Sequence, residues 1–195
     1  MGSSRNAASP RRKKRRYASY FDWHIKGRKE LGVLEELIRS MEIEGPSSYH
    51  SPRIQDPDPP DCSALDAQGA LVGFEIAELV SEDAVRRTEQ GETLVSDWTP
   101  HMVALALNSI LLEKDGKSFV GGPYARIAVL VHTDEYLIAY DEVRPYVEGR
   151  SFGPFKTIDE AYLLLSYNPY YQRCPFLRLD VSPRRAAAGV SPSSA

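Results

Sequence analysis

The chain has 195 residues, of which 42% are hydrophobic and 26% charged, a composition typical of one soluble globular domain. No run approaches the ~20 apolar residues of a membrane-spanning helix, and the first residues lack the apolar stretch of a secretory signal. The two cysteines have no CxxC spacing, which excludes a disulfide framework and a structural zinc cluster. These features exclude a membrane span and predict a cytoplasmic protein.

Charge is distributed unevenly along the chain. The net charge is −3, but residues 1–16 hold seven basic residues and no acidic one, which leaves 17 basic against 27 acidic residues, or −10, for the rest. Six of these cations are consecutive: Arg11, Arg12, Lys13, Lys14, Arg15 and Arg16. Their mutual repulsion predicts a disordered segment, which either binds nucleic acid or only adds solubility. The acidic remainder is unsuited to binding a duplex by itself.

We expect a disordered basic tail at 1–16, an α/β domain at 17–181 and a disordered tail rich in serine, proline and alanine at 182–195. The first element predicted in the domain is a helix over 22–43, one face of which is apolar at Leu34, Leu37, Ile38 and Met41. Glu30 lies on the same face. Its carboxylate either points toward a site or reaches out to water from the first turn.

The next segment predicts a β-hairpin. Five prolines between residues 45 and 60 exclude a helix and allow a short edge strand at 49–54. Two extended runs, 61–66 and 70–80, are separated by three residues that end in a glycine, which is hairpin spacing. Glu75 lies in the middle of the second run, which is apolar on both faces. Because burial of a lone carboxylate is costly, Glu75 requires a partner or a metal ion.

Helices and strands alternate in the remaining sequence. We expect helices at 82–91, 99–116 and 157–166, and strands at 125–132 and 176–181. Thr99-Pro100 begins the second helix, and a capping box from Thr157 to Glu160 begins the third. This order predicts an α/β sandwich around a mixed sheet. Four scattered histidines and the lack of a phosphate-binding glycine motif give no support to histidine-metal, Ser-His-Asp or nucleotide-loop chemistry.

Asp61 and Glu75 fall on consecutive strands of the predicted hairpin. Two carboxylates at neighbouring strand positions form half of a coordination shell for Mg²⁺ or Mn²⁺, which water and a substrate phosphate complete. Such an ion activates a water and stabilises charge on the phosphate, which is the chemistry of phosphodiester cleavage. The alternatives are a turn aspartate after two prolines for Asp61 and a salt bridge to Arg126 for Glu75.

The segment from Pro60 to Val80 resembles the PD-(D/E)XK nuclease superfamily, in which a Pro-Asp pair precedes an acidic half-motif on the next strand. The half-motif here is Glu75-Ile76-Ala77, similar to uncharacterised bacterial members that read Glu-x-Thr. The resemblance implies a restriction-endonuclease-like fold, a mixed β-sheet flanked by helices whose core is a helix, three strands, a helix and a strand. It implies a nuclease with Mg²⁺ or Mn²⁺ held by Asp61 and Glu75, and with Glu30 completing the catalytic site.

One departure from the family concerns the lysine two residues after the acid, which is Ala77 in this chain. The missing cation could come from Lys26, Arg86 or Arg87. The first hypothesis is therefore a metal-dependent nuclease, and many nucleases of this kind act as homodimers. The alternative is a catalytically inactive nuclease-like fold that serves as a binding module.

A weaker hypothesis concerns tyrosines, which either stack on bases, bind a partner or fill the core: Tyr162, Tyr167, Tyr170 and Tyr171.

Overall fold

The computed structural model describes residues 26–81, 97–135 and 137–183. Its helices are α1 (Lys26–Glu44), α3 (Pro100–Lys114) and α4 (Tyr140–Glu148). Its strands are β1 (Tyr49–Ile54), β2 (Cys62–Asp66), β3 (Leu71–Glu78), β4 (Arg126–Thr133), β5 (Ser151–Phe155), β6 (Glu160–Leu165) and β7 (Phe176–Pro183). None of these helices is both long and apolar enough to cross a membrane.

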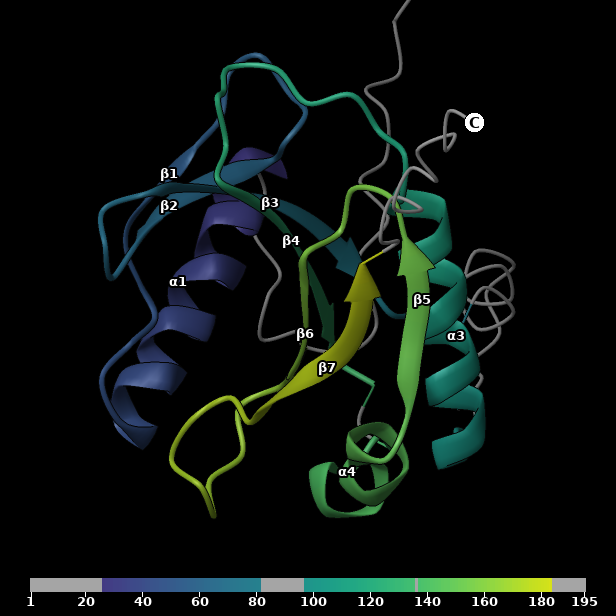
Figure 1. Ribbon diagram of the computed structural model, residues 1–195. Helices are drawn as coiled ribbons and strands as arrows, with labels where there is room; N and C mark the ends of the chain where they lie inside the picture. The colour runs from purple at the N-terminus through teal and green to yellow at the C-terminus, as the bar shows by residue number, and fades with distance from the viewer. Residues whose placement is uncertain (1–25, 82–96, 136, 184–195) are drawn as a thin grey trace, which may run out of the picture.

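The strands form one seven-stranded mixed sheet in the order β1-β2-β3-β4-β6-β7-β5. β1, β2 and β3 are antiparallel neighbours, β3, β4 and β6 run parallel, and β7 returns antiparallel to β6. α1 lies on one side of the sheet, and α3 and α4 lie on the other (Figure 1). The predicted class, a single α/β domain with a mixed sheet flanked by helices, is confirmed.

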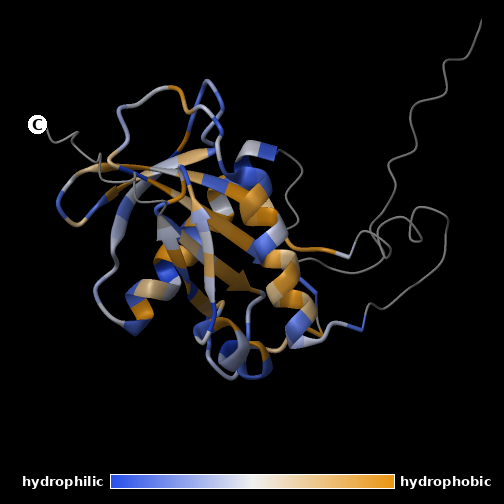
Figure 2. Ribbon diagram, turned by 45° about the vertical axis from the view of Figure 1, so that its right-hand side comes forward, coloured by the Kyte–Doolittle hydropathy of each residue, from blue (hydrophilic) through white to orange (hydrophobic). Residues whose placement is uncertain are grey.

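Each face of the sheet has its own apolar core. Alternate residues of β3, such as Val72 and Phe74, pack with Leu34 and Leu37 of α1. On the other face, Val129 of β4 belongs to the cluster that includes the buried side of α3 and α4. Strands in the middle of the sheet are accordingly orange, the hydrophobic colour, in Figure 2. These two cores hold the three layers together because apolar burial is the main favourable term in folding.

Most elements predicted from the sequence lie where they were expected. The first helix, the edge strand, the hairpin, the central strand and the last strand agree within a few residues. The Thr99 side chain caps α3 by accepting a hydrogen bond from the Met102 amide at 3.2 Å. β7 extends to Pro183, so the predicted C-terminal tail begins later than residue 182. The basic tail, the predicted helix at 82–91 and most of the C-terminal tail lie outside the described residues.

The helix predicted at 157–166 is wrong, because this segment contains strand β6. The expected cap is engaged elsewhere: the Thr157 hydroxyl donates to Asp115 at 3.0 Å, and Asp159 accepts the Ile127 amide at 2.8 Å. All six residues of β6 are buried, and the strand pairs with β4 on one side and β7 on the other. The short apolar run fits either structure, and sheet pairing decides the outcome. α4 and β5 were not predicted.

Both outer strands of the sheet contain a proline. β1 has Pro52, with Ser51 at a φ of 54° and a register irregularity at this point. β5 has Pro154, and its register with β7 shifts between Phe152 and Phe155. Proline cannot donate a ladder hydrogen bond, so it is confined to such edge positions.

Leu37→Ala in α1 should lower the free energy of unfolding by about 3 kcal/mol, because Leu37 is fully buried and its removal leaves a cavity. Chemical denaturation monitored by circular dichroism measures this change. Ile43→Ala on the same helix is the control, since Ile43 is 52% exposed and its truncation should cost less than about 0.5 kcal/mol. Equal losses in the two variants would contradict the assignment of the core.

Candidate metal centre

The β2–β3 hairpin brings Asp61 and Glu75 together. Cys62 pairs with Phe74 in the antiparallel register, so Asp61, one residue earlier, lies opposite Glu75. Asp61 is held there because its Oδ2 accepts the backbone amide of Ile76 at 2.8 Å. Asp61 is 7% exposed and Glu75 1% exposed, so both carboxylates are withdrawn from water. The two residues singled out by the sequence are therefore neighbours.

Gly73 allows the segment before Asp61 to approach β3 closely. A Cβ at this position would lie 3.0 Å from Ile127 Cδ1 and 3.1 Å from Pro60 Cγ. The α3–β4 loop closes over the same place, where Val120 donates its amide to the Pro59 carbonyl at 2.9 Å. The prolines before Asp61 are thus packed between β3 and the α3–β4 loop. This packing fixes the position of the Asp61 backbone and therefore of its side chain.

Two further carboxylates join this pair, one from the loop and one from α1. Asp58, Asp61 and Glu75 each offer an oxygen atom within 4.8 Å of one another. Burial and the neighbouring charge of Asp61 raise the pKa of Glu30, against the opposing effect of Lys26. We call Glu30, Asp58, Asp61 and Glu75 the acidic centre. Glu30 is thus placed at the predicted site and does not simply extend into water.

Among the described residues, three lysines contact carboxylates of the acidic centre. Lys26 Nζ lies 3.3 Å from Glu30, 3.5 Å from Asp58 and 3.7 Å from Asp61. Lys114, from the last turn of α3, lies 3.4 Å from Glu75 Oε2. Lys117, from the following loop, donates to the same oxygen. Two ammonium groups, one from the end of α3 and one from the following loop, therefore lie beside Glu75.

Glu75 is only partly satisfied by these lysines. Its Oε2 atom accepts hydrogen bonds from both Lys114 and Lys117. Its Oε1 atom is buried and has no hydrogen-bond partner among the described residues. A buried, unpartnered carboxylate oxygen costs free energy. A cation coordinated between Glu75 and the other carboxylates would remove that cost, so the donor set fits a hard divalent metal ion.

Of the cations proposed from the sequence, Lys26 is confirmed as a neighbour, and Arg86 and Arg87 lie outside the described residues. Arg126, the salt-bridge partner considered for Glu75 as the alternative to a metal ion, instead pairs with Asp66 and Glu160. Lys114 and Lys117 were missed. One signal could have indicated Lys114: it continues the buried stripe of α3 formed by Val103, Leu107 and Leu111.

The four tyrosines considered together in the sequence separate in the structure. Tyr162 is 2% exposed and belongs to the core. Tyr170 is 86% exposed and packs edge-to-face on Tyr171, with ring centroids 5.1 Å apart. These residues and Tyr167 follow β6 in the loop before β7, at the opposite end of the sheet from the α3–β4 loop (Figure 1). They do not take part in the acidic centre.

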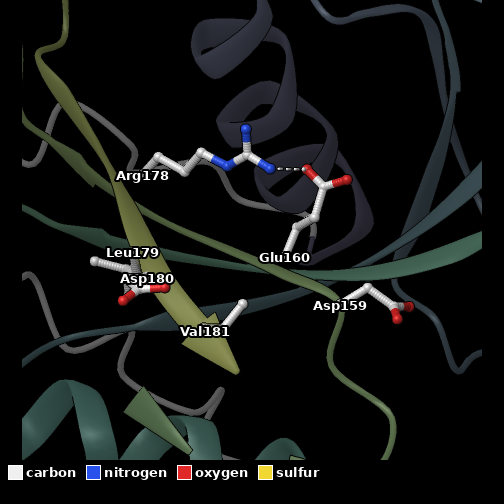
Figure 3. Close-up of a pocket in the computed structure, with 6 residues that line it drawn as sticks. All are labelled: Asp159, Glu160, Arg178, Leu179, Asp180 and Val181. Carbon is white, nitrogen blue, oxygen red and sulfur yellow. Dashed lines mark ion pairs between the residues drawn. The ribbon is translucent and has the colours of Figure 1, made fainter. Parts of the chain in front are cut away.

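A separate depression of about 330 Å³ lies over β6 and β7, lined by Asp159, Glu160, Arg178, Leu179, Asp180 and Val181 (Figure 3). Its charged groups already have protein partners. Arg178 lies 3.7 Å from Glu160, which also accepts hydrogen bonds from Tyr49 and Tyr162 at 2.6 Å and faces Arg126 at 2.7 Å. Asp180 accepts from Ser151 at 2.9 Å. The depression is therefore the open side of a structural polar network.

Glu160→Gln should lower the free energy of unfolding at pH 7 by about 2–3 kcal/mol, because the charged hydrogen bonds of a buried carboxylate are lost. Burial raises the pKa of Glu160, but Tyr162, Tyr49 and Arg126 outweigh burial and leave that pKa lowered. The stabilisation is therefore present above the ordinary glutamate pKa and is lost as the pH falls through the lowered one.

Denaturant titrations of wild type and Glu160→Gln at pH 7 and pH 3.5 measure the difference in their free energies of unfolding. This difference should be smaller at pH 3.5. Glu148→Gln is the control, since its pair with Arg144 on α4 is exposed and worth less than about 1 kcal/mol. A difference that widens on acidification would contradict the lowered pKa.

In comparisons with protein-family models, curated proteins and solved structures, nothing matches this chain.

Proposed function

We propose that the protein is a divalent-metal-dependent nuclease that hydrolyses phosphodiester bonds at the acidic centre. The observation on which this proposal rests is the convergence of Asp58, Asp61 and Glu75 within 4.8 Å, beside the ammonium groups of Lys114 and Lys117. Carboxylate oxygens suit Mg²⁺ or Mn²⁺, and nearby cations suit a phosphate substrate. When bound, the ion would activate a water and stabilise charge on the phosphate.

The order of elements supports the finer assignment to a restriction-endonuclease-like fold. α1 is followed by the antiparallel strands β1, β2 and β3, then by α3, and then by β4 parallel to β3. This is the helix, three strands, helix and strand that the resemblance implies. Asp61 and Glu75 lie on its second and third strands or immediately beside them, as the resemblance requires.

Lys114 and Lys117 take the role of the missing motif lysine in this proposal. Burial lowers the pKa of Lys117, but the hydrogen bond and charge of Glu75 outweigh burial and leave that pKa raised. Lys117 is therefore an ammonium ion at neutral pH. An ammonium donates hydrogen bonds to phosphate oxygens and stabilises the charge that develops on them, whereas it cannot accept a proton from water.

The proposed nucleic-acid partner explains why a basic segment precedes an acidic domain. Residues 17–195 carry a net charge of −10, which opposes binding of a polyanion, while residues 11–16 are all cationic. These cations lie outside the described residues. Their contribution would be salt-dependent and independent of sequence, because phosphate contacts do not distinguish bases.

Glu75→Gln and Asp61→Asn should each abolish Mg²⁺ or Mn²⁺ binding in calorimetry. They should also lower cleavage of plasmid and single-stranded substrates at least about 100-fold. Each variant keeps the side-chain volume and removes the charge that a metal requires. Cleavage that persists in the double variant would overturn the nuclease assignment.

Glu78→Gln is the matched control for this experiment. Glu78 lies on the same strand, but it pairs with Lys29 of α1 at 2.6 Å. Its loss should leave both metal binding and cleavage close to wild type.

Lys114→Met and Lys117→Met separate a role in chemistry from a role in holding the fold. We expect cleavage to fall about 10²–10³-fold in the double variant, as for removal of other groups that stabilise transition-state charge. Metal binding measured by calorimetry should stay the same or become tighter, because two positive charges leave the centre. Unchanged cleavage would exclude a role of both lysines in the chemistry. Loss of metal binding would show that the lysines hold the fold of the centre.

A second candidate is a catalytically inactive, nuclease-like binding module. The observation that favours it is that Glu75 Oε2 is already neutralised by two lysines, so that one carboxylate oxygen of the centre has partners without a metal ion. Turnover that depends on a divalent metal ion would exclude this candidate, and a stable domain that binds neither metal nor substrate would favour it.

A further inference from the structure

Lys26 is the first residue of α1, and its side chain contacts three carboxylates of the acidic centre at once. Its Nζ atom lies 3.3 Å from Glu30 on the same helix. The same atom lies 3.5 Å from Asp58 and 3.7 Å from Asp61, both in the loop between β1 and β2. Asp58 and Asp61 belong to the group that could hold a metal ion. One ammonium group therefore bridges carboxylates on which the proposed metal ion depends.

The helix itself gains little from a cation at this position. The N-terminus of a helix is the positive end of its macrodipole, so it disfavours a lysine. In addition, a lysine four residues before a glutamate, as in Lys26 and Glu30, is the weaker order of such a pair. The contacts with Asp58 and Asp61, which are distant in the sequence, therefore account for the position of this ammonium group.

Lys26 differs in exposure from the two lysines that contact Glu75. The side chain of Lys26 is 74% exposed, whereas that of Lys114 is 16% and that of Lys117 37% exposed. Exposed ion pairs are weak, because water competes for both charges and the long side chain loses rotamer freedom. Lys26 can move its head group into solvent by rotating its side-chain bonds while the backbone of α1 stays in place. Of the three lysines, it is the one that can leave at the lowest cost.

Charge balance favours its departure when a metal ion binds. The four ionised carboxylates of the acidic centre carry a formal charge of −4, and the three lysines that contact them carry +3. A divalent ion added beside all three lysines brings the total to +1, whereas the same ion with Lys26 released brings it to zero. Two cations that share the same carboxylates repel one another strongly at such short range.

We propose that Lys26 competes with the metal ion for the acidic centre. In the metal-free protein its ammonium group neutralises Glu30, Asp58 and Asp61, and a divalent ion binds there only when this group moves out to solvent. The inference rests on the proposed metal centre and adds a residue that sets its metal affinity. Lys26 thus has two opposite effects, because it stabilises the metal-free protein and weakens the binding of the ion.

Lys26→Gln tests both effects in the full chain. Calorimetric titration with Mn²⁺ should give a dissociation constant at least about tenfold lower than that of the wild type, because the competing charge is gone. Without metal, the variant should melt at a lower temperature, since three carboxylates lose a counter-ion. The same concentration of Mn²⁺ should then raise its melting temperature by more than that of the wild type. Neither measurement depends on nuclease activity.

Lys29→Gln is the matched control. It removes one positive charge from the same part of α1, but Lys29 pairs with Glu78 at 2.6 Å, outside the acidic centre. It should bind Mn²⁺ as the wild type does, which separates the contacts of Lys26 from a general effect of charge. Lys26→Arg retains a cation at the position and should bind Mn²⁺ as weakly as the wild type.

The outcomes distinguish this inference from the proposed function. Equal Mn²⁺ affinity in the wild type and Lys26→Gln would overturn the competition and leave the metal centre in place. Weaker binding in Lys26→Gln would also overturn it and show that the lysine supports the metal site. No Mn²⁺ binding by either protein would overturn the metal centre together with the inference. Binding by the variant alone would support both.

Discussion

The organisation of this protein depends on a carboxylate buried in the centre of its sheet. Glu75 lies in the middle of β3, which pairs with β2 on one side and β4 on the other, and it is 1% exposed. The end of α3 and the loop after it supply Lys114 and Lys117, and the residue just before β2 is Asp61. The end of α3, the α3–β4 loop and the start of β2 are therefore held at one place by electrostatic attraction as well as by packing. A charge kept in such a position at a cost in stability is typical of a functional site.

Local patterns in the sequence were sufficient for most of the fold. The hairpin around Gly69 and the capped start of α3 depend on turn and cap chemistry within a few residues, so they could be identified without tertiary information. β6 could not, because Thr157 and Glu160 have the spacing of a capping box, and only their contacts with distant residues show that it is not used as one. α4 has Pro145 in its interior, which hides it from a search for helical patterns.

The same division applies to the candidate site. Asp61 and Glu75 could be paired from the sequence because hairpin register is local. Lys114 and Lys117 are about 40 residues after Glu75 in the chain. No local sequence pattern predicts which strand the end of α3 contacts. Arg126 was the reasonable partner for a buried glutamate, but in the parallel register it lies beside Val72, three residues away from Glu75 along β3. The sheet register excludes Arg126, and only the tertiary contacts of the end of α3 and the loop after it identify Lys114 and Lys117.

The prolines in the two outer strands have a consequence for behaviour at high concentration. A free strand edge offers a row of unpaired amides and carbonyls on which another chain can add a strand, and this is a common start of fibrillar aggregation. In β1 and β5, Pro52 and Pro154 remove an amide from that row, and irregular register bends the edge at the same points. The two outer strands are therefore poor templates for the addition of a further strand, which lowers the tendency of the folded domain to form fibrils.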